Sequence, residues 1–198
     1  MSAYRTRVRR RRPHTLVAAA VCVTVLVASA FAVRAWLVAP FSVPSASMAP
    51  TLRAGELILA DRTRAGQAHR GDVVVFDGTG YFGGPDSHAT YWVKRVIGVG
   101  GDRVSCCDDA GAITINGQAL DELYLAPGTQ PSRIRFDVEV PTGHLFLLGD
   151  NRADSTDSRS LLGAPGGGMV PVERVVGPVT RVIWPPGRAR SLPPGDAG

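Results

Sequence analysis

Lysine is almost absent from this chain of 198 residues. The sequence contains 22 lysine and arginine residues, and all of them except Lys94 are arginines. A surface charge or an ion pair can use either residue type, but only lysine loses its proton readily when burial lowers its pKa. Position 94, in the segment YWVKRVIG, is therefore a candidate for a neutral amine that acts as a base. Chance retention of one lysine is the alternative interpretation.

Cysteine is also scarce, with three residues in the chain. Cys22 lies in an apolar run, and Cys106 and Cys107 are adjacent. Adjacent cysteines lack the spacing of a zinc site, and they bridge only with strained geometry, so the sequence leaves their redox state open. We therefore predict neither a metal site nor another cofactor.

Acidic residues are missing from the first 34 positions, which carry seven arginines. The remaining chain holds the other 15 basic residues and all 17 acidic ones, so the net charge of +5 arises from the N-terminus alone. A nucleic-acid-binding domain would concentrate positive charge on its own surface. This distribution argues against a nucleic-acid partner.

One long apolar run, TLVAAAVCVTVLVASAFAV (15–33), follows the arginines. As a helix it would extend roughly 28 Å, close to the hydrocarbon thickness of a bilayer. We predict a basic cytoplasmic tail over 1–14, a transmembrane helix over 15–34 and an extracytoplasmic domain beyond it, because the basic residues precede the run. A cleaved secretory signal is the alternative, since ASAFA (28–32) has small residues at the spacing of a cleavage site.

Helical periodicity and internal repeats are absent after this run. Short segments rich in valine, isoleucine and phenylalanine alternate with turn residues, which is typical of a mostly β, antiparallel fold. Asn116-Gly117 is a strong hairpin signal. The Pro/Gly-rich end, 185–198, is expected to be disordered. The segments expected as strands are 55–62, 71–78, 90–99, 111–120, 132–141, 143–151 and 172–185.

Two further segments carry clustered polar groups. FSVPSASMAPTL (41–52) holds hydroxyls between Pro44 and Pro50, which favours a fixed loop over a central strand. GDNRADSTDSRS (149–160) follows an apolar strand, and its acids and arginines suit a salt-bridged turn, with Asp150–Arg152 as one possible pair.

The segments PSASMAPTL, GDVVVF, YWVKRVIGVGGD and FLLGDNRADSTDSR, in this order behind an apolar run, resemble the bacterial type I signal peptidases over about residues 15–184. The resemblance implies an antiparallel β-sheet peptidase domain over 35–184 with a small β insertion at about 101–142. It also implies a membrane-anchored serine endopeptidase that cuts signal peptides from exported preproteins after Ala-x-Ala-like sites. The implied partners are these preproteins, the lipid bilayer and the secretion translocon.

Roles for individual residues follow from the same resemblance. Ser47 matches the nucleophile, and Lys94 matches the general base of a Ser–Lys dyad. Ser45, together with the backbone N–H of Ser47, matches the oxyanion hole. Further matches are the lysine-orienting Ser155, the supporting pair Asp157 and Arg159, and the residues that pack around the lysine, Phe76, Trp92 and Leu147.

Two residues depart from the usual family pattern. Trp92 stands where tyrosine or phenylalanine is common, and Asp154 stands where asparagine is frequent. A carboxylate at position 154 would raise the pKa of the lysine if it came close to the amine, so the sequence leaves the pH optimum open. Other interpretations are a self-processing Ser–Lys peptidase, an inactive anchored β-domain, and a histidine-based triad that uses His144. The preferred precursors and the oligomeric state are not evident from the sequence.

Overall fold

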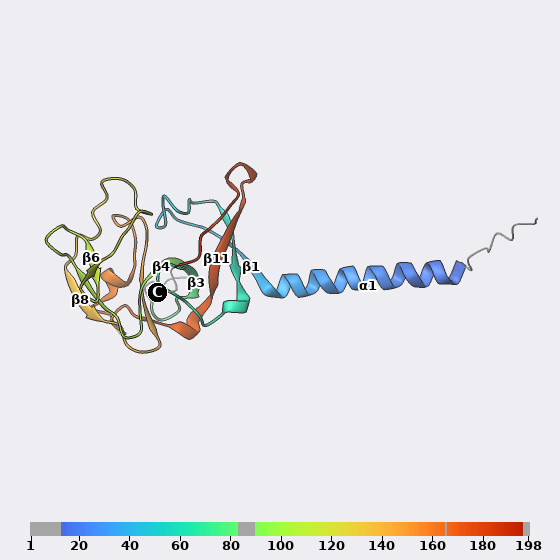
Figure 1. Ribbon diagram of the computed structural model, residues 1–198, viewed down its shortest axis with the longest axis horizontal. Helices are drawn as coiled ribbons and strands as arrows, with labels where there is room; N and C mark the ends of the chain where they lie inside the picture. The colour runs from blue at the N-terminus through green and yellow to red at the C-terminus, as the bar shows by residue number, and fades with distance from the viewer. Residues whose placement is uncertain (1–12, 83–89, 165, 196–198) are drawn as a thin grey trace, which may run out of the picture. The chain divides into compact units, whose positions relative to one another are not determined.

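The computed structural model describes residues 13–82, 90–164 and 166–195 (Figure 1). The chain divides into two compact units, the first ending at Leu37 and the second running from Val38. Most of the basic tail predicted over 1–14 lies outside the described residues.

The first unit contains one helix, α1 (Pro13–Leu37). Proline is tolerated in the first turn of a helix, and Pro40 lies just beyond the end of α1, where a helix cannot continue through it. The side chains described in α1, residues 17–29, 36 and 37, are all exposed. No helix in the described part of the chain is both long and apolar enough to cross a membrane, so the transmembrane span predicted over 15–34 is not supported.

The second unit is built on a large antiparallel sheet, which confirms the mostly β prediction. In spatial order its strands are β1 (Val38–Ser42), β2 (Leu57–Asp61), β11 (Val175–Trp184), β3 (Val73–Asp77), β4 (Tyr91–Val99), β9 (His144–Leu148) and β10 (Val170–Pro171), and β12 (Arg190–Ser191) pairs with β11. Strand β1 was not expected from the sequence. It contains Pro40 and forms an edge of the sheet, which is where a proline that cannot donate a ladder hydrogen bond is tolerated.

A second, smaller sheet is formed by residues 103–139, inside the segment where the insertion is expected. Its order is β7 (Gln118–Ala119), β6 (Ile113–Ile115), β5 (Arg103–Cys106) and β8 (Phe136–Glu139), all antiparallel. The β6–β7 turn is the expected hairpin, with positive φ values of 52° at Asn116 and 82° at Gly117. Strands β6 and β8 mark this sheet in Figure 1, beside the β3–β4 part of the large sheet. Cys106 and Cys107 are joined by a disulfide.

Strand β4 separates two apolar clusters because successive side chains point to opposite faces. Val96 belongs to a cluster with Phe76, Leu145 and Leu147. Ile97 belongs to a different cluster, which joins the large sheet to residues of the small sheet such as Val104. Lys94 is two residues from Val96 and so lies on the Val96 face of β4.

Four short 3-10 helices connect the strands: η1 (Arg62–Arg64), η2 (Ser158–Leu161), η3 (Val172–Arg174) and η4 (Pro186–Arg188). The last of these corrects the prediction of disorder over 185–198, because η4 and β12 are regular elements. Arg190 donates to both carboxylate oxygens of the fully buried Glu56, at 3.0 and 3.1 Å, and the Gly195 N–H donates to Asp72 at 2.8 Å. The tail therefore packs onto the domain as far as residue 195.

Candidate active site

The serine-containing loop between β1 and β2 is anchored by its apolar residues. Met48 and Leu52 are 1% and 0% exposed, whereas Ser45 is exposed and Ser47 is half-buried. The Leu52 N–H donates to the Met48 carbonyl at 2.9 Å, which forms a short helical turn. Burying the apolar side chains leaves the two serine hydroxyls on the accessible side of the loop.

Ser47 and Lys94 are in direct contact. Lys94 Nζ donates to Ser47 Oγ at 2.8 Å, although the two residues are 47 positions apart in the sequence. The lysine side chain comes from the centre of β4 and is only 1% exposed. The structure thus joins the two residues that the sequence marks as nucleophile and base.

The amine of Lys94 sits in surroundings that disfavour its charge. Burial lowers the pKa of Lys94 from 10.5 to about 8, and the nearby carboxylates of Asp157 and Asp150 oppose this shift. Asp154 is exposed and does not contribute to this shift. The acids of the same loop that do contribute, Asp150 and Asp157, are buried.

Phe76, Trp92 and Leu147, the residues predicted to pack around the lysine, lie on the same face of the sheet as this amine. Phe76 pairs with Trp92 across β3 and β4, and Leu147 pairs with Val96 across β4 and β9, which places all of them on the Lys94 face. Phe76 and Leu147 are 0% exposed. Lys94 Nζ lies 5.6 Å from the centre of the Trp92 ring, within the range of a cation–π contact.

Ser45 lies close to the nucleophile. Its Oγ donates to Ser47 Oγ at 3.3 Å and lies 3.5 Å from the Ser47 backbone nitrogen. The hydroxyl of Ser45 and the N–H of Ser47, the two expected oxyanion donors, are therefore side by side at the open side of the loop.

Residues 149–159, which we call the 149–159 loop, hold the nucleophile from the other side. The Asn151 N–H donates to the Ser47 carbonyl at 3.0 Å, and its side-chain amide donates to the Ala46 carbonyl at 3.2 Å. At Gly149 an added methyl group would lie 2.2 Å from Ser155 Oγ and 2.5 Å from the Ser47 carbonyl oxygen. Only glycine allows the loop to approach Ser47 this closely.

Ser155 is half-buried at the same point of contact, and its hydroxyl makes no hydrogen bond. Its Oγ is the one unpartnered buried side-chain oxygen or nitrogen in the part of the chain that is described. The hydrogen bond to Lys94 that the resemblance implies is not formed in this structure. A buried hydroxyl without a partner costs free energy.

Asp157 and Arg159 form a bidentate ion pair with distances of 2.9 and 2.7 Å. The Gly149 N–H donates to Asp157 at 3.1 Å, and Asp157 also caps the N-terminus of η2. This pair therefore fixes both ends of the 149–159 loop.

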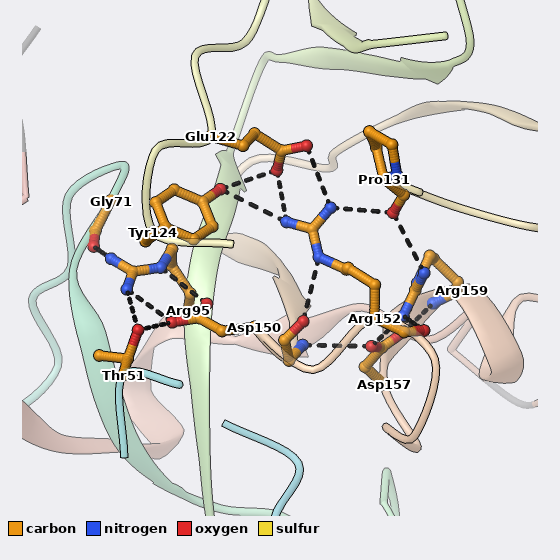
Figure 2. Close-up of polar contacts among 11 residues, drawn as sticks. Thr51, Gly71, Arg95, Glu122, Tyr124, Pro131, Asp150, Arg152, Asp157 and Arg159 are labelled. Carbon is orange, nitrogen blue, oxygen red and sulfur yellow. Dashed lines mark hydrogen bonds and ion pairs between the residues drawn. The ribbon is translucent and has the colours of Figure 1, made fainter. Parts of the chain in front are cut away.

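The possible Asp150–Arg152 pair is not present. Asp150 instead accepts two hydrogen bonds from Arg95, at 2.9 and 2.7 Å, and Arg152 pairs with Glu122 of the insertion (Figure 2). Sequence reasoning missed Arg95, Glu122 and Tyr124. Arg95 was signalled only by its position next to Lys94, and nothing local marks the other two.

A histidine-based triad receives no support. His144 contacts the carbonyl of Thr142 at 3.1 Å, and the base in contact with Ser47 is Lys94. Within residues 13–82, 90–164 and 166–195, no group of three or more histidine, cysteine or acidic side chains is arranged to hold a metal ion.

Several known proteins resemble this chain in sequence over most of its length. The family described as "Signal peptidase, peptidase S26" matches residues 16–184. A probable signal peptidase I of Mycobacterium leprae is 36% identical over 75% of this chain and 69% of its own length. Signal peptidase I of Bacillus licheniformis is 35% identical over 82% of this chain and 86% of its own length. A crystal structure of a signal peptidase I from Enterococcus faecalis, 27% identical, covers 58% of this chain and 97% of that chain with a TM-score of 0.44. The chain thus belongs to the bacterial type I signal peptidase family, peptidase S26, and is a serine peptidase.

Proposed function

We propose that this peptidase removes N-terminal signal peptides from exported preproteins by a Ser–Lys dyad mechanism. The 2.8 Å contact between Ser47 Oγ and the buried Lys94 Nζ carries the proposal. The relatives named signal peptidase I supply the substrate class. Serine is a weak nucleophile until a base removes its proton, and a lysine with a pKa near 8 supplies such a base at neutral to mildly alkaline pH.

Catalysis begins when the neutral amine of Lys94 accepts the proton of Ser47 Oγ. The oxygen then attacks the carbonyl carbon of the scissile bond, and the carbonyl oxygen becomes an oxyanion. The N–H of Ser47 and the hydroxyl of Ser45 turn from each other to donate to this oxyanion, and one such donor typically contributes about 3 kcal/mol. The ammonium of Lys94 next protonates the leaving amine, which releases the mature protein. Lys94 then activates a water molecule that hydrolyses the acyl-enzyme.

The other site residues have supporting roles in this proposal. The unpartnered hydroxyl of Ser155 accepts a hydrogen bond from the ammonium form of Lys94 after proton transfer. The Asp157–Arg159 pair keeps the 149–159 loop in place. Trp92, half-buried beside the amine, limits the space next to the dyad, which is consistent with small residues at positions −1 and −3 of the precursor.

The test uses a model preprotein and mass spectrometry of its products. The unaltered protein should cut after an Ala-x-Ala-like sequence, and Ser47→Ala should leave the precursor intact. Ser191→Ala, a serine on the distant strand β12, is the matched control and should cut normally. Cleavage that persists in Ser47→Ala would assign the nucleophile elsewhere.

Lys94→Arg tests the base separately. This substitution keeps a positive charge and a long side chain but removes the ability to become neutral. We expect no cleavage at any pH between 6 and 10. Turnover at the normal rate would refute the neutral-amine mechanism while leaving Ser47 as the nucleophile.

A further inference from the structure

The 149–159 loop is bound by the small β insertion as well as by the large sheet (Figure 2). Arg152 reaches out of the loop and donates from both terminal nitrogens to the carboxylate of Glu122, one of these contacts being 3.2 Å. It also donates to the carbonyl of Pro131 at 2.9 Å. The insertion therefore supplies the acceptors for the outer end of this guanidinium.

Tyr124 ties a second arginine to the same group. Its hydroxyl donates to Glu122 at 2.8 Å and accepts from Arg152 at 3.3 Å. The face of its ring lies 3.9 Å from the guanidinium carbon of Arg95, which is the partner of Asp150. One tyrosine thus contacts both arginines that bind the start of the 149–159 loop.

These contacts continue to the nucleophile through the loop backbone. Arg152 Nε donates to the Gly149 carbonyl at 3.0 Å, and Arg95 holds Asp150. The next residue, Asn151, donates its N–H to the Ser47 carbonyl. Arg152 and three consecutive loop residues therefore connect Glu122 to Ser47.

The ion pair between Arg152 and Glu122 is buried, so few arrangements of the two side chains satisfy both charges. The side chains of Arg152 and Glu122 are 1% and 7% exposed. Burial lowers the pKa of Arg152, but the hydrogen bonds and charge of Glu122 outweigh burial and raise it overall. Burial raises the pKa of the Tyr124 hydroxyl, which therefore stays protonated as a donor to Glu122. Breaking a buried ion pair strongly destabilises the fold because it leaves a buried charge without a partner. Arg152 therefore remains bound to the insertion.

Apolar packing also joins the insertion to the large sheet, because Leu120 and Tyr124 pack against the buried cluster that contains Ile97. A cavity of about 600 Å³ has Tyr124 and Arg95 in its lining. The polar contacts of Glu122 and Tyr124 therefore act together with apolar packing in connecting the insertion to the 149–159 loop.

We infer that Glu122 and Tyr124 are positioning residues that set the 149–159 loop, and through it Ser47, in the geometry needed for acylation. This inference rests on the proposed function. It gives the insertion a role in turnover in addition to folding, although none of the described hydrogen bonds of Ser47 Oγ and Lys94 Nζ involves an insertion residue.

The test measures kcat and KM separately for Glu122→Gln and Tyr124→Phe with a peptide that carries a signal-peptidase cleavage site. Glu122→Gln removes the charge at constant size, and Tyr124→Phe removes one oxygen while keeping the ring on Arg95. Glu139→Gln, an exposed glutamate of the same insertion, is the matched control. Assays are run well below each variant's unfolding temperature, with the folded fraction verified by circular dichroism.

We expect kcat to fall on the order of tenfold to a hundredfold for Glu122→Gln and a few-fold for Tyr124→Phe, because small displacements of reacting groups have large kinetic effects. KM should stay within about twofold, and the double variant should be no slower than Glu122→Gln, because both changes act through Arg152. Tyr124→Phe decides the matter if Glu122→Gln does not fold.

Other outcomes overturn the inference in distinguishable ways. An unchanged kcat with a lowered unfolding temperature would make the group purely structural. A raised KM with unchanged kcat would make it part of substrate binding. If the unaltered protein itself fails to cut the peptide, the proposed function fails first.

Discussion

Replacing Lys94 by methionine should abolish cleavage and, at neutral pH, stabilise the fold. Methionine has a similar length and no charge, so it suits the apolar surroundings of Phe76 and Leu147. The folded-state pKa of Lys94 is about 8, below its ordinary value of 10.5. A group whose pKa is lowered by folding opposes folding wherever the unfolded state still binds the proton.

The size and the pH range of this effect follow from the two pKa values. The difference of about 2.5 units corresponds to about 3 kcal/mol, which is the cost of burying the ammonium at pH 7. Below pH 8 both states are protonated, and the full cost is present. Between pH 8 and pH 10.5 the unfolded state binds more protons, so the stability of the unaltered protein rises with pH and the cost disappears. Loss of the hydrogen bond to Ser47 subtracts about 1 kcal/mol from the gain.

Urea unfolding of the unaltered protein and of Lys94→Met, at half-unit intervals from pH 6 to pH 11, measures this directly. We expect the variant to be more stable by about 2 kcal/mol at pH 7, with the advantage lost by about pH 10.5. Other titrating groups are common to both proteins and cancel in the difference. If the stability difference between the two proteins does not vary with pH, or if the variant is less stable at pH 7, folding does not lower the pKa of Lys94.

Three further predictions concern the site and its supports. For a Lys94 base with a pKa of about 8, kcat/KM should rise about tenfold per pH unit below pH 8 and level off above it, as a pH–rate profile would show. Gly149→Ala should disable cleavage, because the methyl group would lie 2.2 Å from a neighbouring hydroxyl oxygen, whereas Gly187→Ala, which meets open space, should behave normally in the same assay. Arg190→Ala should cost about 3 kcal/mol in urea unfolding at pH 7, because it leaves the buried carboxylate of Glu56 without its main partner. The pKa of Glu56 is lowered, since Arg190 outweighs the opposing effect of burial, so this loss should shrink as the pH falls below 4.5.

The parts of the site that were predictable are those marked by residue type. Lys94 stands out because lysine is otherwise absent, and the Ser47 loop stands out because its prolines and apolar residues are unusual for a linker. Strand β4 was predicted over 90–99 and runs from 91 to 99, because its valines and isoleucine sit between clear turn residues. These signals depend on residues that are close together in the sequence, so they can be recognised without knowing the fold.

The elements that were missed depend on partners distant in the sequence. The tail after Pro185 has a composition typical of disorder, yet Arg190 meets Glu56 across 134 positions. Glu122 and Tyr124 lie in a segment without any motif, and their partner Arg152 is about 30 residues away. Nothing in a single sequence indicates which acid a given arginine will bind, so such pairs become visible only in the structure.

The use of arginine and lysine in this protein follows one physical rule. The buried cations with structural roles, Arg95, Arg152 and Arg159, each bind a carboxylate through two nitrogens, the strong geometry that a guanidinium offers. Among the described contacts of Lys94, the hydrogen-bonding partner is a hydroxyl, and the carboxylates of Asp150 and Asp157 are already bound to arginines. At Lys94 burial outweighs the attraction of these carboxylates, and its pKa falls. An arginine at this position would stay charged, so the one site that requires a neutral amine is the one site where lysine remains.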